Sequence, residues 1–494
     1  MRPIKRVVLV GQDIALWLSA SVLAAAFADQ DLSITVIEQP SLLRNHDVVA
    51  SLPPLEGLHA RLGLKENIVL KSCAGQYSLG TLVRDFVRQD SGYFQPYGDH
   101  GPDLGGVPFF AQYIRARRAG LTVAYEDFSL TASAAKQGRF LQPSREALAY
   151  GLCDHGYHLG AREYAALLKA EAVRRRVTVQ PGRAAEAVRD AETGLVSAVR
   201  LRDGSVVEGD LFLDCSGPSS VLQDQDVTSW RQWFPFDRMI SVGAEGMRRL
   251  PPFAQMRALP NSILHTLPVQ GRTAITHVFN SHAKSDDEAL RQTAAAGLPL
   301  AADAVADSLD PGCRKRNWSG NVVALGDTAC IFDPSDHPGL FALQFALVLL
   351  ISLFPRQAGE GAGAREFNRR TQAANERLRD FQIAQLKFNG LSDGVWGTAR
   401  DRTVPDTLAE KIDLFSANGQ VPSLAEETFS AESWRARFFG NGLMPEGFAP
   451  GAIAVGDQEL ITEMRHRLHF IRTQVEAMDS HDAYVELHCA RSFA

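Results

Sequence analysis

The chain has 494 residues, of which 45% are hydrophobic and 22% charged, and this composition excludes collagen, coiled coils, disordered chains and small disulfide scaffolds. Its net charge is −6, from 51 basic and 57 acidic residues, so no nucleic-acid or membrane partner is expected. Six scattered cysteines, without CxxC or zinc spacing, predict no metal site and fit a reducing compartment. Because the N-terminus has no signal-peptide pattern and the longest apolar run has ten residues, we expect a soluble cytoplasmic protein.

The sequence opens with the pattern of a strand, a tight turn, a helix and a second strand. Residues 7–10 (VVLV) are typical of a buried parallel strand, and Gly11 ends it. Residues 14–28, rich in alanine and leucine, favour a helix, and residues 33–38 (SITVIE) favour a second buried strand. In such a βαβ unit the helix N-terminus binds dinucleotide phosphates, and an acid ending the second strand binds a ribose. Glu38 is that acid here.

Further elements follow the same patterns along the chain. The pattern predicts a strand at residues 177–180, and apolar runs predict buried strands at residues 211–214 and 322–325. Amphipathic or charged stretches predict helices at residues 161–176, 364–388 and 457–478. Gly326 and Asp327 follow the last of these strands, and we expect them to offer a backbone N–H and a carboxylate to the ribityl and second phosphate region of FAD.

The glycine motif of the first turn differs from the usual dinucleotide pattern. GxGxxG would need glycines at 11, 13 and 16, whereas the chain has Gly11, Asp13 and Leu16. The Asp13 carboxylate would face the anionic pyrophosphate of the dinucleotide. Repulsion between two unit charges about 4 Å apart costs roughly 4 kcal/mol at an effective dielectric near 20, whereas micromolar binding supplies about 8 kcal/mol. Two interpretations stay open: a divergent dinucleotide site, or a βαβ unit that keeps its fold and has lost its ligand.

Seven segments of the chain match sequence motifs of one known protein family, and they occur in the same order as in that family. They are Ala15 with Trp17 in the opening turn, and residues 50–64, 157–159, 209–217 (GDLFLDCSG), 321–334 (NVVALGDTACIFDP), 367–381 and 478–484 (MDSHDAY). On these segments the chain resembles the flavin-dependent tryptophan halogenase family over nearly its whole length. In that family reduced FAD, supplied by a separate flavin reductase, reacts with O₂ and halide to give hypohalous acid. A lysine then presents the halogen to an aromatic carbon, and a glutamate assists.

The resemblance implies an α/β fold. It is a glutathione-reductase-like, Rossmann-type FAD-binding domain with a substrate-side β-sheet and a C-terminal helical cap. The implied ranges are 1–90, 155–220 and 318–355 for the FAD domain, 91–154 and 221–317 for the sheet, and 356–494 for the cap. The cofactor-binding residues it implies are Gly11, Asp13, Ala15, Glu38, Ala50, Ser51, Gly326, Asp327, Pro334, Gly339 and Leu340.

The chain departs from the family pattern at the reactive centre. Ser78 stands in place of the lysine, and serine can neither form a haloamine nor carry positive charge. The glutamate position holds Asp336, and the paired tryptophans are Ile263 and His265. Loss of those tryptophans would permit direct oxygenation of the substrate by the flavin. In the halide-binding turn His337 is followed by a proline, which has no N–H to donate.

Four of these residues are candidates for catalysis, and each also has a simpler interpretation. Asp336 beside His337 could act as a general base, or the pair could be a polar loop that has drifted. His265 could donate to an oxidised flavin species, or it could be a core histidine with satisfied hydrogen bonds. Ser78 lacks a GxSxG elbow, so it could simply be a small residue facing the pocket.

Three functions follow. The favoured one is an FAD-dependent oxidoreductase with monooxygenase-type activity and without efficient halogenation. Its substrate would be an indole-like or phenol-like aromatic, free or carried on a peptide. The alternative is a non-catalytic homologue with weak or no FAD binding, acting as a partner in a homodimer or with a paralogous subunit. The third is a genuine halogenase that uses a different guiding residue.

Overall fold

A parallel sheet forms the centre of the computed structural model, which describes residues 4–490 except 141–152, 225, 298, 302, 358, 360 and 393. Its strand order is β20-β21-β12-β1-β2-β8, with only the edge strand β20 antiparallel. The bounds are Arg6–Gly11 for β1, Ser33–Glu38 for β2, Thr178–Gln180 for β8, Leu211–Cys215 for β12, Trp318–Ser319 for β20 and Val322–Ala324 for β21. The strands predicted from apolar runs are therefore confirmed, with β12 and β21 fully buried and the edge strand β8 largely exposed.

Three helices pack on this sheet: α1 (Asp13–Ala26), α7 (Ala161–Arg174) and α9 (Gly339–Ser352). The apolar side chains of β1 and α1 are almost wholly buried in one core. In the strand register Gly11 pairs with both Glu38 and Cys215, so the carboxyl ends of β2 and β12 flank the turn into α1. The predicted βαβ unit is thus confirmed, and its turn lies at the carboxyl edge of the sheet, where parallel α/β folds bind ligands.

A seven-stranded sheet lies beside the first, in the order β18-β14-β17-β16-β15-β5-β6. Its bounds are Gly80–Arg84 for β5, Gly92–Pro96 for β6, Arg238–Glu245 for β14, Ala254–Leu259 for β15, Ser262–Val269 for β16, Arg272–Phe279 for β17 and Val305–Ser308 for β18. A small sheet of β3 (Val48–Ala50), β7 (Gly156–Gly160) and β4 (Gln76–Ser78) adjoins β16. Strand β5 joins the large sheet although it precedes residue 91, and the division into domains stays a prediction.

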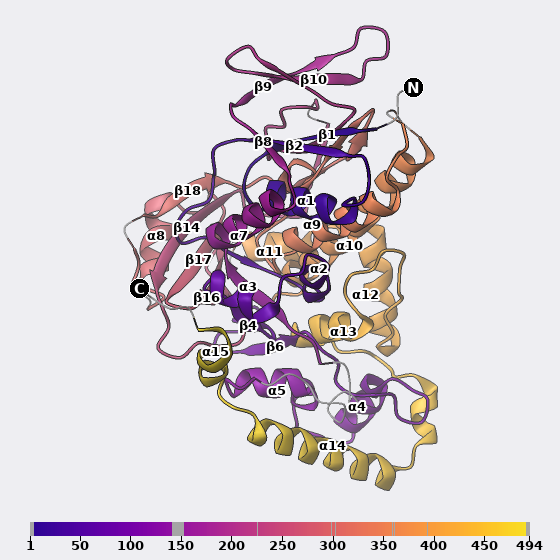
Figure 1. Ribbon diagram of the computed structural model, residues 1–494. Coiled ribbons are helices and arrows are strands. Elements are labelled where there is room, and N and C mark those ends of the chain that lie inside the picture. The colour runs from indigo at the N-terminus through magenta and orange to yellow at the C-terminus, as the bar shows by residue number, and fades with distance from the viewer. Residues whose placement is uncertain are drawn as a thin grey trace.

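Helices from the last third of the chain cover the side and the lower end of the molecule in Figure 1. They are α10 (Ala362–Lys387), α11 (Gly394–Asp401), α12 (Asp406–Asn418), α13 (Ala431–Gly440), α14 (Asp457–Ala477) and α15 (His481–Cys489). Helix α14 runs beside α5 (Leu130–Lys136), near α4 (Phe109–Arg118) (Figure 1). An aromatic core that includes Trp396, Trp434 and Phe438 joins these helices to the large sheet.

The remaining elements are short. They are α2 (Glu56–Arg61), α3 (Glu66–Ser72), α8 (Asp286–Ala294), β9 (Ala184–Arg189), β10 (Val196–Leu201), β11 (Val206–Glu208), β13 (Val227–Ser229), β19 (Gly312–Arg314) and β22 (Cys330–Ile331). Strands β9 to β11 form a separate sheet that projects at the top of Figure 1. In the part of the chain that the structure describes, every helix is too short or too polar to cross a bilayer.

Candidate cofactor pocket and reactive centre

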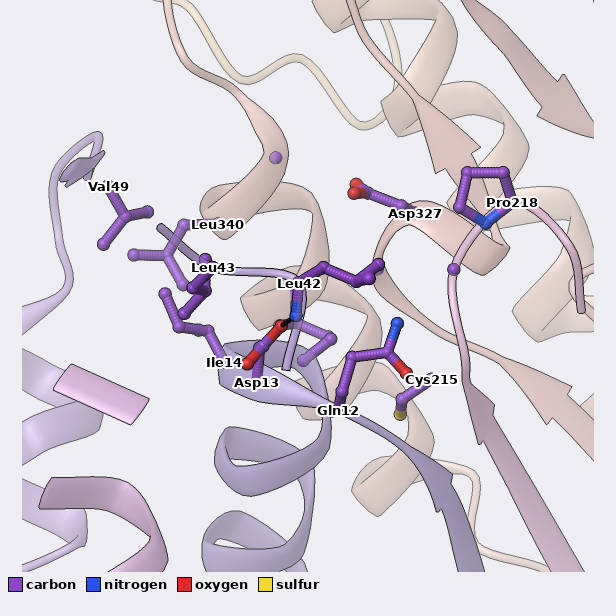
Figure 2. A pocket seen from close by; sticks show the side chains of 15 residues that line it. Gln12, Asp13, Ile14, Leu42, Leu43, Val49, Cys215, Pro218, Asp327 and Leu340 are labelled. Atoms are coloured by element: carbon purple, nitrogen blue, oxygen red, sulfur yellow. Dashed lines mark hydrogen bonds between the residues drawn. The ribbon is translucent and has the colours of Figure 1, made fainter. Parts of the chain in front are cut away.

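A pocket of about 310 Å³ lies at the carboxyl edge of the central sheet, where α1 begins (Figure 2). Six residues predicted to bind the cofactor line it: Asp13, Ala15, Gly326, Asp327, Gly339 and Leu340. Cys215 and Gly217 of the 209–217 motif also line it, and the lining is completed by Gln12, Ile14, Leu42, Leu43, Val49, Pro218 and Leu343. Four chain segments that are distant in sequence thus meet around one concave site.

Two glycines allow these segments to approach closely. A Cβ on Gly11, whose φ is +154°, would lie 2.2 Å from the backbone oxygen of Cys215. A Cβ on Gly326, whose φ is +61°, would lie 2.8 Å from the Cβ of Ala15. Only glycine fits either place, so these two residues set how near β12 and the Gly326 turn come to the start of α1.

Gly11→Ala is expected to lower the free energy of unfolding by about 2–4 kcal/mol, because backbone must move to admit the methyl group. Urea denaturation measures the change. Gly57→Ala is the matched control, since a Cβ there meets no atom within 4 Å and the residue lies in α2. Equal stability of the two variants would contradict the close approach at Gly11.

Asp13 occupies the position where a dinucleotide motif has its second glycine. Its φ is +58°, a left-handed conformation that aspartate tolerates better than most residues. Its carboxylate accepts a hydrogen bond from the Leu42 N–H at 2.9 Å, which Figure 2 shows. The carboxylate therefore lines the pocket and also fastens the loop around Leu42 to the start of α1.

Glu38 ends β2, as predicted, and both of its carboxylate oxygens have partners in the protein. One accepts from the Trp17 indole N–H at 3.1 Å and the other from the Lys169 ammonium at 2.6 Å. A ribose hydroxyl would have to share this carboxylate with them. Among the residues described, the other five predicted cofactor residues are not in the lining of the pocket: Gly11, Glu38, Ala50, Ser51 and Pro334.

The other predicted cofactor residues lie at its margins. Ser51 follows Ala50 and Val49 in the chain, and its hydroxyl accepts from the Tyr157 N–H at 2.9 Å. Pro334 contributes its carbonyl to the loop before α9, where it accepts from the His337 N–H. Asp327 opens onto the pocket, and desolvation by the surrounding protein raises its pKa.

Ser78 lies at the end of β4, fully buried. Its hydroxyl donates to the Gly80 carbonyl oxygen at 3.4 Å, and the Tyr97 side chain lies near it. Burial raises the pKa of Tyr97, and the charge of Asp336 raises it further, so Tyr97 stays protonated at neutral pH. Tyr97, which sequence reasoning did not identify, thus lies between Ser78 and Asp336.

Asp336 forms a buried ion pair that the sequence motifs did not reveal. One of its oxygens accepts from Arg437 of α13 at 2.6 Å, and both side chains are at most 6% exposed. The backbone at Asp336 and His337 has φ values of +59° and +50°, which places both side chains on a sharp bend before α9. Burial opposes the charge of Arg437, but the attraction of Asp336 outweighs it and raises the pKa of Arg437.

His265 and His337 face each other near this pair. Their ring centroids are 5.9 Å apart, at a steep angle. Desolvation lowers the pKa of His337 to about 4, with Asp336 opposing, and it lowers the pKa of His265 well below the usual value. Both imidazoles are therefore neutral at pH 7. The charged groups beside them are the Asp336–Arg437 ion pair.

The comparisons with known proteins agree across nearly the whole chain. A model of the tryptophan halogenase family matches residues 6–457. Tryptophan 6-halogenase ThaL of Streptomyces albogriseolus is 25% identical, over 92% of this chain and 93% of its own. BrvH, a flavin-dependent halogenase from Brevundimonas sp. BAL3, has a TM-score of 0.92 and 29% identity over 98% of this chain and 99% of its own. Xcc4156, a flavin-dependent halogenase from Xanthomonas campestris, has a TM-score of 0.94 and 26% identity over 99% of both chains. The resemblance and fold class predicted from the sequence are thereby confirmed, and the chain belongs to the tryptophan halogenase family.

Proposed function

We propose that this protein is an FAD-dependent oxidoreductase that inserts oxygen, rather than halogen, into an aromatic substrate. A separate flavin reductase supplies the reduced FAD, which provides two electrons when bound. One atom of O₂ then replaces the hydrogen of an aromatic C–H bond as a hydroxyl, and the other leaves as water. The substrate is an indole-like or phenol-like ring, free or carried on a peptide.

The pocket at the start of α1 suits an anionic dinucleotide. Helices α1 and α9, of 14 residues each, both begin at its wall, and helix N-termini attract phosphate through free N–H groups and the helix dipole. Gly339, the first residue of α9, has no atom within 4 Å of where a Cβ would lie, so a ligand has room beside the backbone there. Asp13 and Asp327 oppose this attraction and weaken it without closing the site.

The single observation that favours oxygen over halogen is the buried Ser78. Its hydroxyl donates to the Gly80 carbonyl oxygen at 3.4 Å, at the position where the family pattern has the lysine that carries halogen. Asp336, at the position of the family's glutamate, is already paired with Arg437. Halogen transfer would need a nucleophilic amine at this position, whereas oxygen transfer from the flavin needs none.

A titration of the purified protein with FAD, followed by flavin fluorescence, tests the first half of this proposal. We expect saturation at low micromolar FAD or below. With flavin reductase, NADH and air, we also expect a hydroxylated product from indole or phenol. Absence of FAD binding up to high micromolar concentrations would contradict the proposal.

A second candidate, a non-catalytic partner subunit, is favoured by one observation. Both oxygens of Glu38 already accept hydrogen bonds from Trp17 and Lys169. Asp13 also places a carboxylate at the turn that would bind phosphate. The site should therefore bind a dinucleotide more weakly than the usual glycine motif does. Failure to bind FAD, together with recovery of a stable paralogous or self-associated complex by affinity purification and size-exclusion chromatography, would support it.

A further inference from the structure

Arg437 is the buried cation of the reactive centre, and it comes from the helical cap. We propose that Arg437 is a positioning residue. It holds one carboxylate oxygen of Asp336 and leaves the other as the acceptor for an O–H or N–H of the aromatic substrate. The inference rests on the proposed function, because it assigns a role in recognising that function's substrate.

The guanidinium of Arg437 is fixed on several sides. One terminal nitrogen donates to Oδ1 of Asp336 at 2.6 Å, and the other donates to Oε1 of Gln385 at 3.0 Å. Its carbon lies 4.0 Å from the centre of the Phe381 ring, so the plane is also held by a cation–π contact. One end of the planar guanidinium thus binds the carboxylate and the other is anchored on Gln385, which fixes the donor that Asp336 meets better than a mobile ammonium would.

A second layer of hydrogen bonds holds Gln385. Its Oε1 also accepts from the Tyr93 hydroxyl at 2.9 Å and from the Asn441 amide at 3.0 Å, and its own amide donates to Asn441 at 2.9 Å. Tyr93 comes from β6, Gln385 from α10, and Asn441 directly follows α13; all three are buried. The network connects the cap to the large sheet and gives Arg437 one defined position.

The second oxygen of Asp336 is the feature that indicates a ligand. Oδ2 is buried and has no hydrogen-bond partner among the described residues, and Asp336 as a whole is 8% exposed. A buried carboxylate oxygen without a donor is costly, so a donor on the substrate would be bound strongly there. The bend at Asp336 and His337 directs this side chain toward Arg437. An ion pair that served stability alone would gain nothing from a buried oxygen without a donor.

The test compares probes that differ only in the hydrogen-bond donor: phenol with anisole, and indole with 1-methylindole. Their dissociation constants for the FAD-free protein are measured by ligand-observed NMR. We expect the donor-bearing probe to bind about tenfold tighter in each pair, the gain from a hydrogen bond to a buried charge.

Three variants test whether the preference for donor-bearing probes depends on Asp336 and Arg437. Asp336→Asn replaces the open acceptor with an amide and is expected to bring the ratio to about one. Arg437→Lys keeps a positive charge but loses the fork, and is expected to lower the ratio several-fold. Arg435→Lys, on the same helix and paired with Glu432, is the matched control and is expected to keep the ratio. If either single variant were poorly folded, Arg437→Gln with Asp336→Asn would remove both charges together.

A ratio near one in the unaltered protein, or a ratio that survives both Asp336→Asn and Arg437→Lys, would overturn this inference. The probes require no flavin, so a protein that fails to bind FAD can still show the preference. Conversely, hydroxylation of aromatic substrates without any donor preference would overturn the role of Arg437 and leave the proposed function standing.

Discussion

Arg437→Met is expected to lower the free energy of unfolding by about 3–5 kcal/mol, because it leaves the buried Asp336 carboxylate without its counter-charge. Methionine approximates the length of the arginine stem and can keep contact with the Phe381 ring, so lost packing contributes little. Urea denaturation of the two proteins, analysed with a common slope, gives the difference.

The double variant Arg437→Met with Asp336→Asn separates charge from packing. It removes both charges, and asparagine tolerates the left-handed backbone at residue 336. We expect it to be about 2 kcal/mol more stable than Arg437→Met alone, a non-additivity that reports direct coupling. If the effects of the two substitutions simply added, the ion pair would not be the interaction that stabilises this centre.

Asp13→Gly is expected to tighten FAD binding by about tenfold to a hundredfold. The substitution removes a negative charge from the wall of a pocket built for phosphates, and glycine adopts the φ of +58° without strain. Two helix N-termini border the same pocket and partly compensate the carboxylate, so the gain falls below the roughly 4 kcal/mol of an unscreened pair.

Asp13→Asn is the matched variant for this effect. It keeps an oxygen that can accept from the Leu42 N–H and keeps the tolerance for positive φ, but it removes the charge. Most of the gain in affinity should therefore remain, and it should shrink at high ionic strength. Unchanged affinity in both variants would show that the phosphates of FAD do not lie beside residue 13.

The parts of this fold that local patterns encode could be predicted from the sequence. The alternation of apolar runs, glycine and helix predicts the βαβ unit, and the position of Glu38 at the end of β2 follows from the length of the second run. What Glu38 bonds could not be predicted, because Lys169 reaches it from a helix more than a hundred residues later. Such pairings depend on how α7 packs on the sheet.

In the reactive centre, too, local sequence patterns predicted the residues but not their partners. Motif positions identified Ser78, His265, Asp336 and His337, but the partner of Asp336 lies 101 residues away on the cap. One local signal was present: Trp434 and Phe438, one turn apart on α13, indicate a buried face, and Arg437 lies between them in the sequence. An arginine among buried positions requires an anion, and that requirement could have led to Asp336.

The mass of the product formed under ¹⁸O₂ with bromide present tests the central claim most directly. The reaction contains the protein, FAD, a flavin reductase, NADH and either indole or phenol. A hydroxylated aromatic that carries one ¹⁸O atom and shows no bromine isotope doublet is the predicted result. A product with the paired bromine peaks and no ¹⁸O would contradict it, since halogen would then be transferred at a centre with Ser78 in place of the amine.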